Sequence, residues 1–226
     1  PARPLERRMT APSMHLHQVE HRTSARFTLR VPSLTIGPGV TTVLGLNGCG
    51  KTTLLRLLAT VMAPTAGEVS VGGQVLTDTN LVAVRRRLGY LPQDDSVPRR
   101  LTAFDHVDLV AVMRELGPGT RGRRAAVHRA LREVQLTDLT GERCGRLSGG
   151  QRRRVALAAA LVGDAELLVL DEPDAHLDHE QRQRLTDSLR ARAGGATIVV
   201  ATHDEQWARS VADRAIRLAD GNLIAT

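Results

Sequence analysis

The chain has 226 residues, of which 42% are hydrophobic and 24% are charged, and its formal net charge is +7. These values predict a soluble globular protein with one well-buried core, and the longest apolar run, 155–162, is far shorter than the roughly 20 residues of a membrane span. Aromatic residues make up only 2%, which argues against a stacking surface for single-stranded nucleic acid. Acidic residues are spread between the arginine clusters, which favours a solvated or partner-facing surface over nucleic-acid binding.

The N-terminal segment 1–13 is basic and contains prolines, but it lacks the apolar stretch of a signal peptide. We therefore expect a disordered lead, followed by one domain over residues 14–226. Between Leu16 and Val75, hydrophobic residues alternate with polar ones, as at Phe27 and Leu29. This alternation predicts an antiparallel sheet layered on the core.

A glycine-rich loop follows the apolar run 40–44. Residues 45–52 match the phosphate-binding pattern G-x-x-x-x-G-K-[ST], in which backbone N–H groups and the start of the next helix bind phosphate oxygens. Lys51 would reach the β- and γ-phosphates of ATP, and the hydroxyl of Thr52 would bind Mg²⁺. The alternative, a glycine turn that caps an ordinary helix, is disfavoured because a strand precedes the loop and an amphipathic helix follows it. The expected nucleotide-binding residues here are Asn47, Gly48, Cys49, Gly50, Lys51, Thr52 and Thr53.

Cys49 lies inside this loop and admits two interpretations. It is either a thiol activated by the helix N-terminus or a small buried side chain that fills space, which we favour. Cys49 and Cys144 show no metal or disulfide spacing, and this usage is typical of a reducing cytosol.

From about Thr102 to Cys144, apolar residues recur at helical spacing, and Gly117-Pro118-Gly119 separates two helices. We predict a helical subdomain over about residues 96–154. It would be inserted into an α/β core formed by about residues 14–95 and 155–226.

The motif Leu147-Ser148-Gly149-Gly150-Gln151 precedes the next helical stretch. A serine and two glycines at a helix N-terminus form a second anion-binding concavity. The alternative is that Ser148 is only the N-cap of that helix. With the loop at 45–52, the chain has two helix starts that suit an anion, whereas one γ-phosphate requires only one.

Two further apolar runs end in polar residues: 167–170 leads into Asp171-Glu172, and 198–201 leads into Thr202-His203. Short apolar runs of this kind predict buried parallel strands, whose carboxyl ends meet at one ligand-binding edge. Asp171 suits the coordination of Mg²⁺, and Glu172 can orient and deprotonate an attacking water. The alternative is a pair of carboxylates that only solvates a strand end.

Together these motifs resemble the ATP-binding-cassette (ABC) class of ATPases, from about residue 14 to the end of the sequence. The Leu147–Gln151 motif is highly specific for that class and lies shortly before the Asp171-Glu172 pair, as it does there. The resemblance implies an α/β fold: a P-loop NTPase core with a mainly parallel sheet, an N-terminal antiparallel β subdomain and an inserted α-helical subdomain. It also implies ATP and Mg²⁺ as cofactors.

The resemblance further implies a head-to-tail dimer, in which the motif of one subunit covers the ATP held by the other. Ser148 and Gly150, flanked by Gly149 and Gln151, would contact the γ-phosphate across the dimer. Gln93 resembles the glutamine that senses Mg²⁺ and links the site to a transmembrane partner. His203 resembles the switch histidine that contacts the γ-phosphate, and Asp178 resembles an aspartate that spans the dimer.

Three positions depart from the pattern of that family. The stretch 21–24 has no aromatic residue to stack on adenine, so His21 or Arg22 would stack instead, or adenine is held loosely. His176 stands where a small residue is usual, and Asp174 replaces a common threonine. None of these changes removes a residue of the hydrolytic set, so we expect turnover of ATP.

We therefore expect an ATPase subunit that powers a membrane transporter, with export of drugs, polysaccharides or haem-related cargo as the branch it resembles most. Its partners would be a permease in a separate chain and a second ATPase subunit, identical or different, at the inner face of the cell membrane. One alternative is a soluble ABC ATPase that acts on nucleic acid or ribosomes, and another is a regulatory subunit that does not hydrolyse ATP. The intact Glu172 and His203 argue against the last.

Overall fold

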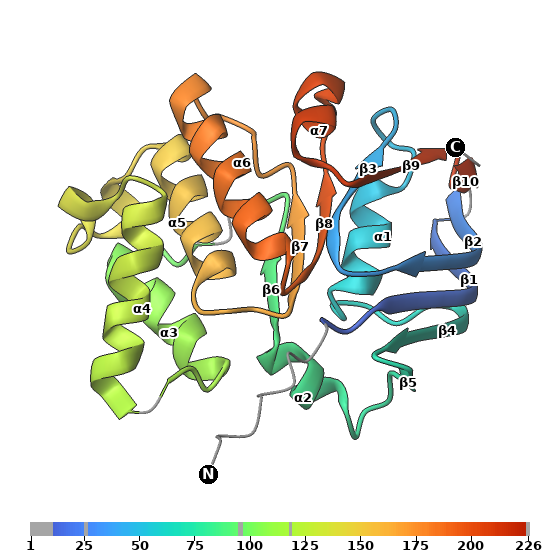
Figure 1. Ribbon diagram of the computed structural model, residues 1–226, viewed down its shortest axis with the longest axis horizontal. Coiled ribbons are helices and arrows are strands. Elements are labelled where there is room, and N and C mark those ends of the chain that lie inside the picture. Colours follow the sequence, from blue (N-terminus) through green and yellow to red (C-terminus); the bar gives the residue numbers. More distant parts are fainter. Residues whose placement is uncertain (1–10, 25–26, 95–96, 118, 225–226) are drawn as a thin grey trace, which may run out of the picture.

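The computed structural model describes residues 11–24, 27–94, 97–117 and 119–224. Its strands form one mixed sheet in the order β5-β4-β1-β2-β10-β9-β3-β8-β7-β6, with helices on both faces (Figure 1). The strands are β1 Met14–Ser24, β2 Phe27–Ile36, β3 Gly39–Leu44, β4 Ala66–Val71, β5 Gln74–Val75, β6 Leu88–Leu91, β7 Leu167–Asp171, β8 Thr197–Ala201, β9 Arg214–Ala219 and β10 Asn222–Ile224. The helices are α1 Lys51–Leu58, α2 Leu81–Arg86, α3 Ala103–Met113, α4 Gly119–Glu133, α5 Gly149–Leu161, α6 His179–Ala193 and α7 Glu205–Val211, with short 3-10 helices η1 Thr137–Leu139 and η2 Cys144–Arg146.

The predicted parallel core is formed by β9, β3, β8, β7 and β6, which pair in parallel in that order. Every residue of β7 and of β8 is buried. Leu168 and Leu170 of β7 pack on the side of α5 and α6, whereas Leu167 and Val169 pack on the side of α1. Apolar side chains on both faces explain why these strands read as continuous hydrophobic runs rather than alternating ones.

The antiparallel strands β1, β2, β4 and β5 are the ones expected from the alternating N-terminal pattern. They belong to the same sheet as the core, because β10 pairs in parallel with β2 at Asn222 and Arg30 and in antiparallel with β9. Helix α1 lies between the two parts of the sheet (Figure 1). Its buried leucines belong to the same apolar cluster as Leu29 of β2 and Val199 of β8.

The helical insert follows β6 and contains α3, α4 and α5, which pack against one another. Helix α5 continues from the insert across the core and lies on β6 and β7. The approach is close: a Cβ atom at Gly89 in β6 would lie 2.1 Å from the carbonyl oxygen of Ala160 in α5. Glycine at this position therefore lets α5 lie directly against the sheet.

Residues 1–10 of the expected lead lie outside the described residues. Residues 11–13 differ from the expectation of disorder, since Ala11 and Pro12 are buried. The carbonyl oxygen of Pro12 accepts a hydrogen bond of 3.0 Å from the hydroxyl of Thr197, and that of Ser13 accepts one of 2.8 Å from the amide of Gly72. These bonds attach the start of β1 to the core before the alternating pattern begins.

Candidate functional site

The phosphate loop has a backbone form that requires glycine. Gly45, Gly48 and Gly50 have φ angles of 153°, 79° and 109°, a region that other L-residues rarely adopt. At Gly45, a Cβ atom would also lie 2.4 Å from the carbonyl oxygen of Leu218. Successive N–H groups in a loop of this kind form an anion-binding concavity.

Lys51 is the first residue of α1, whose first turn contains no acidic side chain. The positive end of the helix dipole is therefore not neutralised locally and favours an anion. Lys51 is a buried residue, and its ammonium donates hydrogen bonds to the carbonyl oxygens of Gly45 at 2.7 Å and Leu46 at 3.1 Å. Phosphate oxygens would compete with these carbonyls for the charged amine.

A cleft of about 340 Å³ opens beside the loop, a size typical of small-molecule sites. The phosphate loop, the second residue after β6 and the carboxylates at the end of β7 all contribute to its wall. The lining residues are Thr23, Phe27, Asn47, Gly48, Gly50, Lys51, Thr52, Thr53, Gln93, Asp171 and Glu172. The structure thus brings together the phosphate loop, Gln93 and the carboxylate pair that the sequence places far apart.

The polar atoms beside Thr52 suit a hard cation. Its hydroxyl donates a hydrogen bond of 3.2 Å to Oε1 of Gln93. Oδ2 of Asp171 is buried and has no hydrogen-bond partner among the described residues. Burial, and to a smaller extent the charge of Glu172, raises the pKa of Asp171, while the nearby hydroxyl of Thr52 and the charges of Arg153 and Lys51 oppose that rise. Oxygen ligands from a hydroxyl, an amide and a carboxylate form the donor set that Mg²⁺ prefers.

Glu172 adopts an uncommon backbone conformation at the end of β7. Its φ angle is 48°, and such a conformation costs about 1–3 kcal/mol in a residue other than glycine. Its amide donates a hydrogen bond of 2.8 Å to the carbonyl oxygen of Ala201 at the end of β8. His203, the second residue after β8, places Nδ1 3.3 Å from Oε1 of Glu172. The histidine side chain is 62% exposed and the carboxylate 20%, so His203 stands on the solvent side of the pair.

The Leu147–Gln151 motif forms the start of α5 and makes no contribution to the described lining of the cleft. Ser148 and Gln151 form a capping box: the Ser148 hydroxyl accepts from the Gln151 amide at 3.2 Å, and Oε1 of Gln151 accepts from the Ser148 amide at 2.8 Å. Ser148 is therefore the N-cap of α5, as the alternative interpretation of the motif predicts. Ser148 and Gly149 are also exposed, so a ligand can reach this helix start.

Asp178 caps α6 in the same way, because its Oδ1 accepts from the amide of Gln181 at 2.8 Å. Before it, His176 adopts a left-handed conformation with φ of 61°. A Cβ atom at Gly150 would lie 3.8 Å from both Cβ and the carbonyl oxygen of His176. The unusual histidine is thus placed against the Leu147–Gln151 motif of its own chain.

Asp174 holds the turn that carries His203. It is buried, and its Oδ2 accepts a hydrogen bond of 3.1 Å from the hydroxyl of Thr202, which in turn accepts from the amide of Asp204 at 3.0 Å. The carboxylate of Asp204 pairs with Arg182 at 2.9 Å. These bonds fix the residues on both sides of His203.

An aromatic residue lines the cleft, although none occurs in the stretch 21–24. Phe27, paired with Ser24 across the β1–β2 register, lies near the loop, because a Cβ atom at Gly50 would be 3.0 Å from its Cζ. His21 points elsewhere, with Nδ1 3.1 Å from the carbonyl oxygen of Ala63. The alternating pattern predicts only that Phe27 lies in a strand; its place at the start of the second antiparallel strand is the signal that could have identified it.

The thiol of Cys49 belongs to the apolar core. The residue is 6% exposed and packs in the same cluster as the leucines of α1. This supports the interpretation of Cys49 as a buried filler, so that only its backbone lies in the phosphate loop.

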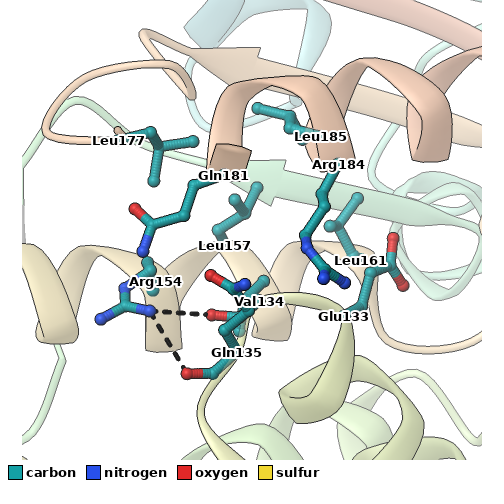
Figure 2. Close-up of a pocket in the computed structure, with 10 residues that line it drawn as sticks. All are labelled: Glu133, Val134, Gln135, Arg154, Leu157, Leu161, Leu177, Gln181, Arg184 and Leu185. Carbon is teal, nitrogen blue, oxygen red and sulfur yellow. Dashed lines mark hydrogen bonds between the residues drawn. The ribbon is translucent and has the colours of Figure 1, made fainter. Parts of the chain in front are cut away.

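A second hollow lies away from the cleft, where α5 and α6 meet the end of α4 (Figure 2). It encloses about 20 Å³, enough for about one water molecule. Arg154 closes one side by donating to the carbonyl oxygens of Val134 at 3.2 Å and Gln135 at 3.3 Å (Figure 2). The hollow is a packing defect between the insert and the core, too small for a nucleotide.

The chain is similar to ATP-binding proteins of ABC transporters in each comparison with known proteins. The family described as "ABC transporter" matches residues 29–175. The chain is 36% identical over 186 residues to the SkfA peptide export ATP-binding protein SkfE of Bacillus subtilis, a match that covers 82% of this chain and 76% of that protein. It is 39% identical over 196 residues to the sulfate/thiosulfate import ATP-binding protein CysA of Methylococcus capsulatus, covering 84% of this chain and 56% of that protein.

Among solved structures, the fold is similar to the dimeric structure of MJ0796, a bacterial ABC transporter cassette. The TM-score is 0.85 at 28% identity, and the match covers 94% of this chain and 97% of that one. A post-hydrolysis state of MJ0796 bound to ADP and Pi gives a TM-score of 0.82 at 27% identity, with the same coverage. Because the relatives include export and import proteins, they do not distinguish the branch that the sequence motifs favoured.

The buried carboxylate of Asp174 makes stability depend on pH. Burial raises the pKa of Asp174, more than the hydrogen bond from Thr202 and the charge of Arg182 lower it. The folded state therefore keeps this proton to a higher pH than the unfolded chain, and the contribution of Asp174 to stability falls as pH rises above about 3.9, the ordinary aspartate pKa. Asp174→Asn removes the titration and keeps an acceptor for Thr202.

We expect the free energy of unfolding of Asp174→Asn, relative to the wild type, to increase from about pH 4 to about pH 7. Urea titrations followed by the fluorescence of Trp207 would measure it. Asp138→Asn, at an exposed position, is the control. A difference between Asp174→Asn and wild type that stays constant over this range would contradict the proposed effect of burial.

Proposed function

Since the chain belongs to the ABC transporter family and is an ATP-hydrolysing subunit that energises transport, we propose that its catalytic centre is the cleft beside Lys51. The observation that carries this proposal is the meeting of three elements in one place. The buried ammonium of Lys51, the carboxylate of Asp171 and the contact between Glu172 and His203 lie at the end of neighbouring strands. Lys51 suits the phosphates, Asp171 suits a divalent cation, and Glu172 with His203 suits the attacking water.

The loop amides and Lys51 bind the β- and γ-phosphates, with Thr53 and Asn47 at the edge of the same cleft. Thr52, Gln93 and Asp171 would hold Mg²⁺, whose charge offsets that of the phosphates when it is bound. Glu172 orients the attacking water and accepts its proton. His203, hydrogen-bonded to Glu172, keeps the carboxylate turned toward the γ-phosphate position.

A second subunit completes the site in this proposal. Ser148 and Gly150 lie outside their own chain's cleft, at an exposed helix start suited to an anion. Leu46, at the rim of the phosphate loop, is 85% exposed, which suits a surface that a partner covers. ABC cassettes dimerise, as the dimeric MJ0796 does. Ser148, Gly149, Gly150 and Gln151 would then face the γ-phosphate of the partner subunit, with Asp178 next to the dimer interface.

The membrane partner is proposed to dock on α3. Leu109, Val112 and Met113 on this helix are 46%, 47% and 70% exposed, which is unusual for large apolar side chains that lie one turn apart. Among the described residues, no helix is long and apolar enough to cross a bilayer. We place the chain at the inner face of the cell membrane, bound to a permease in another chain.

Export is proposed as the direction of transport, because the stretch from Leu88 to Gln93, together with Leu101-Thr102, resembles the export branch most. Identification of the membrane protein that co-purifies with this chain tests both the docking and the direction.

Phe27 is proposed to stack on adenine. Phe27→Ala should weaken ATP binding by about 1–3 kcal/mol, the usual value for stacking of a base on an aromatic ring. Inorganic tripolyphosphate has no base, and its affinity for the variant should be unchanged in calorimetry. Phe104→Ala is the aromatic control, because the ring of Phe104 lies in the insert, tilted against the ring of His128. An equal loss of affinity for ATP and for tripolyphosphate would show that Phe27 supports the loop rather than the base.

Glu172→Gln should bind ATP but hydrolyse it about 10²–10⁴-fold more slowly, because the amide cannot accept the proton of water. The ATP-bound form should then accumulate as a dimer in size-exclusion chromatography. Lys51→Ala, which removes the buried ammonium from the phosphate position, should not bind ATP in calorimetry and should remain monomeric. Normal hydrolysis by a monomeric Glu172→Gln variant would rule out both the catalytic role and the need for a dimer.

A further inference from the structure

Arg153 is a buried arginine in the helix that follows the Leu147–Gln151 motif. It lies in α5, five residues after Ser148, and is 4% exposed. Arginine is seldom buried to this degree unless its charge is compensated. Its neighbours on the helix, Arg152 and Arg154, are only partly buried. The charge of Arg153 must therefore be compensated by groups around it.

The guanidinium of Arg153 binds the backbone of two separate strand ends. Nη1 donates to the carbonyl oxygens of Pro92 and of Gln93, the latter at 3.2 Å, directly after β6. Nη2 donates to the carbonyl oxygens of Asp171 and of Glu172, the latter at 3.2 Å, at the end of β7. One planar group with donors in a rigid fork thus connects the segment that carries Gln93 to the segment that carries Glu172.

These contacts are made where the backbone is strained. Glu172 has a left-handed conformation, which persists only if its surroundings hold it in place. The donors of Arg153 reach the carbonyl groups of Asp171 and Glu172, which are the peptide groups on either side of the φ and ψ angles of Glu172. A neutral or shorter side chain would leave these carbonyl groups without the charged donor, in a place that water reaches poorly.

We propose that Arg153 is a positioning residue for hydrolysis, which fixes the carboxylate of Glu172 and the amide of Gln93 relative to one another and to α5. This inference rests on the proposed catalytic role of Glu172. Ser148 caps the same helix. One rigid helix therefore carries both the N-terminus that faces the partner's nucleotide and the guanidinium that binds the backbone of Glu172 in its own chain. The helix therefore links the two nucleotide sites of the dimer through a side chain rather than through the loop alone.

The test compares Arg153→Gln with Arg154→Gln in the full chain. Arg154 is the matched control: it lies on the same helix and also donates to two backbone carbonyls, but these belong to Val134 and Gln135 at the second hollow (Figure 2). Arg153→Gln should lower kcat about 10- to 100-fold, the effect of a misplaced catalytic group, with the dissociation constant for ATP within about twofold. Arg154→Gln should leave kcat unchanged.

Hydrogen exchange gives a readout that general destabilisation would not produce. In Arg153→Gln, amides in peptides that cover residues 90–94 and 170–174 should both exchange faster, while the phosphate loop at 45–52 should not. Arg154→Gln should change neither of the first two segments. Faster exchange spread over the whole chain, or confined to one of the two segments, would overturn the proposal.

If Arg153→Gln does not fold, Arg153→Lys decides the question. Lysine keeps the charge but concentrates its donors on one atom, so it cannot reach both strand ends with a planar fork. We expect a kcat about tenfold below that of the wild type with unchanged ATP affinity, and a wild-type kcat would overturn the proposal. The Glu172→Gln variant separates the two hypotheses: if it hydrolyses ATP normally, the proposed site is wrong, whereas if it is inactive and Arg153→Gln is fully active, only the role of Arg153 is wrong.

Discussion

The burial of β7 and β8 on both faces is the constraint on which the site depends. Helices cover the two faces, so each strand is apolar along its length and polar groups can appear only where it ends. Parallel pairing then brings these ends to one edge of the sheet. Asp171, Glu172 and His203 meet the phosphate loop because no other part of these strands can accommodate them.

Burial at this edge also determines which partners the charged groups must have. Lys51 donates to carbonyl oxygens of its own loop, whereas one oxygen of Asp171 is buried without a hydrogen-bond partner among the residues that the structure describes. A divalent cation would supply the interaction that Asp171 lacks, and the phosphate oxygens of the same ligand would compete with the loop carbonyls for Lys51. In a dimer, the exposed start of α5 of a second subunit would face the same ligand. In the proposed dimer, each chain therefore supplies half of a site.

The departures from the family pattern fall at places where the backbone is held by side chains. Asp174 occupies a usual threonine position and binds Thr202 beside His203, and His176 lies against the Leu147–Gln151 motif with a left-handed backbone. Both positions are next to the proposed catalytic residues. Arg153 is a further side chain that binds the backbone at this edge of the sheet.

The sequence by itself determined the fold class and the motifs, because these follow from local periodicity and from residue spacing within one loop. The turn between a strand and a helix at 45–52, the buried strands predicted over 167–170 and 198–201, and the helical insert are all present in the structure. The tertiary structure alone decided which distant residues meet. Phe27 reaches the cleft through a strand pairing, Pro12 reaches Thr197 across the core, and Arg153 joins two strand ends. Such contacts depend on how helices and strands pack, and the local pattern around one residue does not indicate which distant residue it will contact.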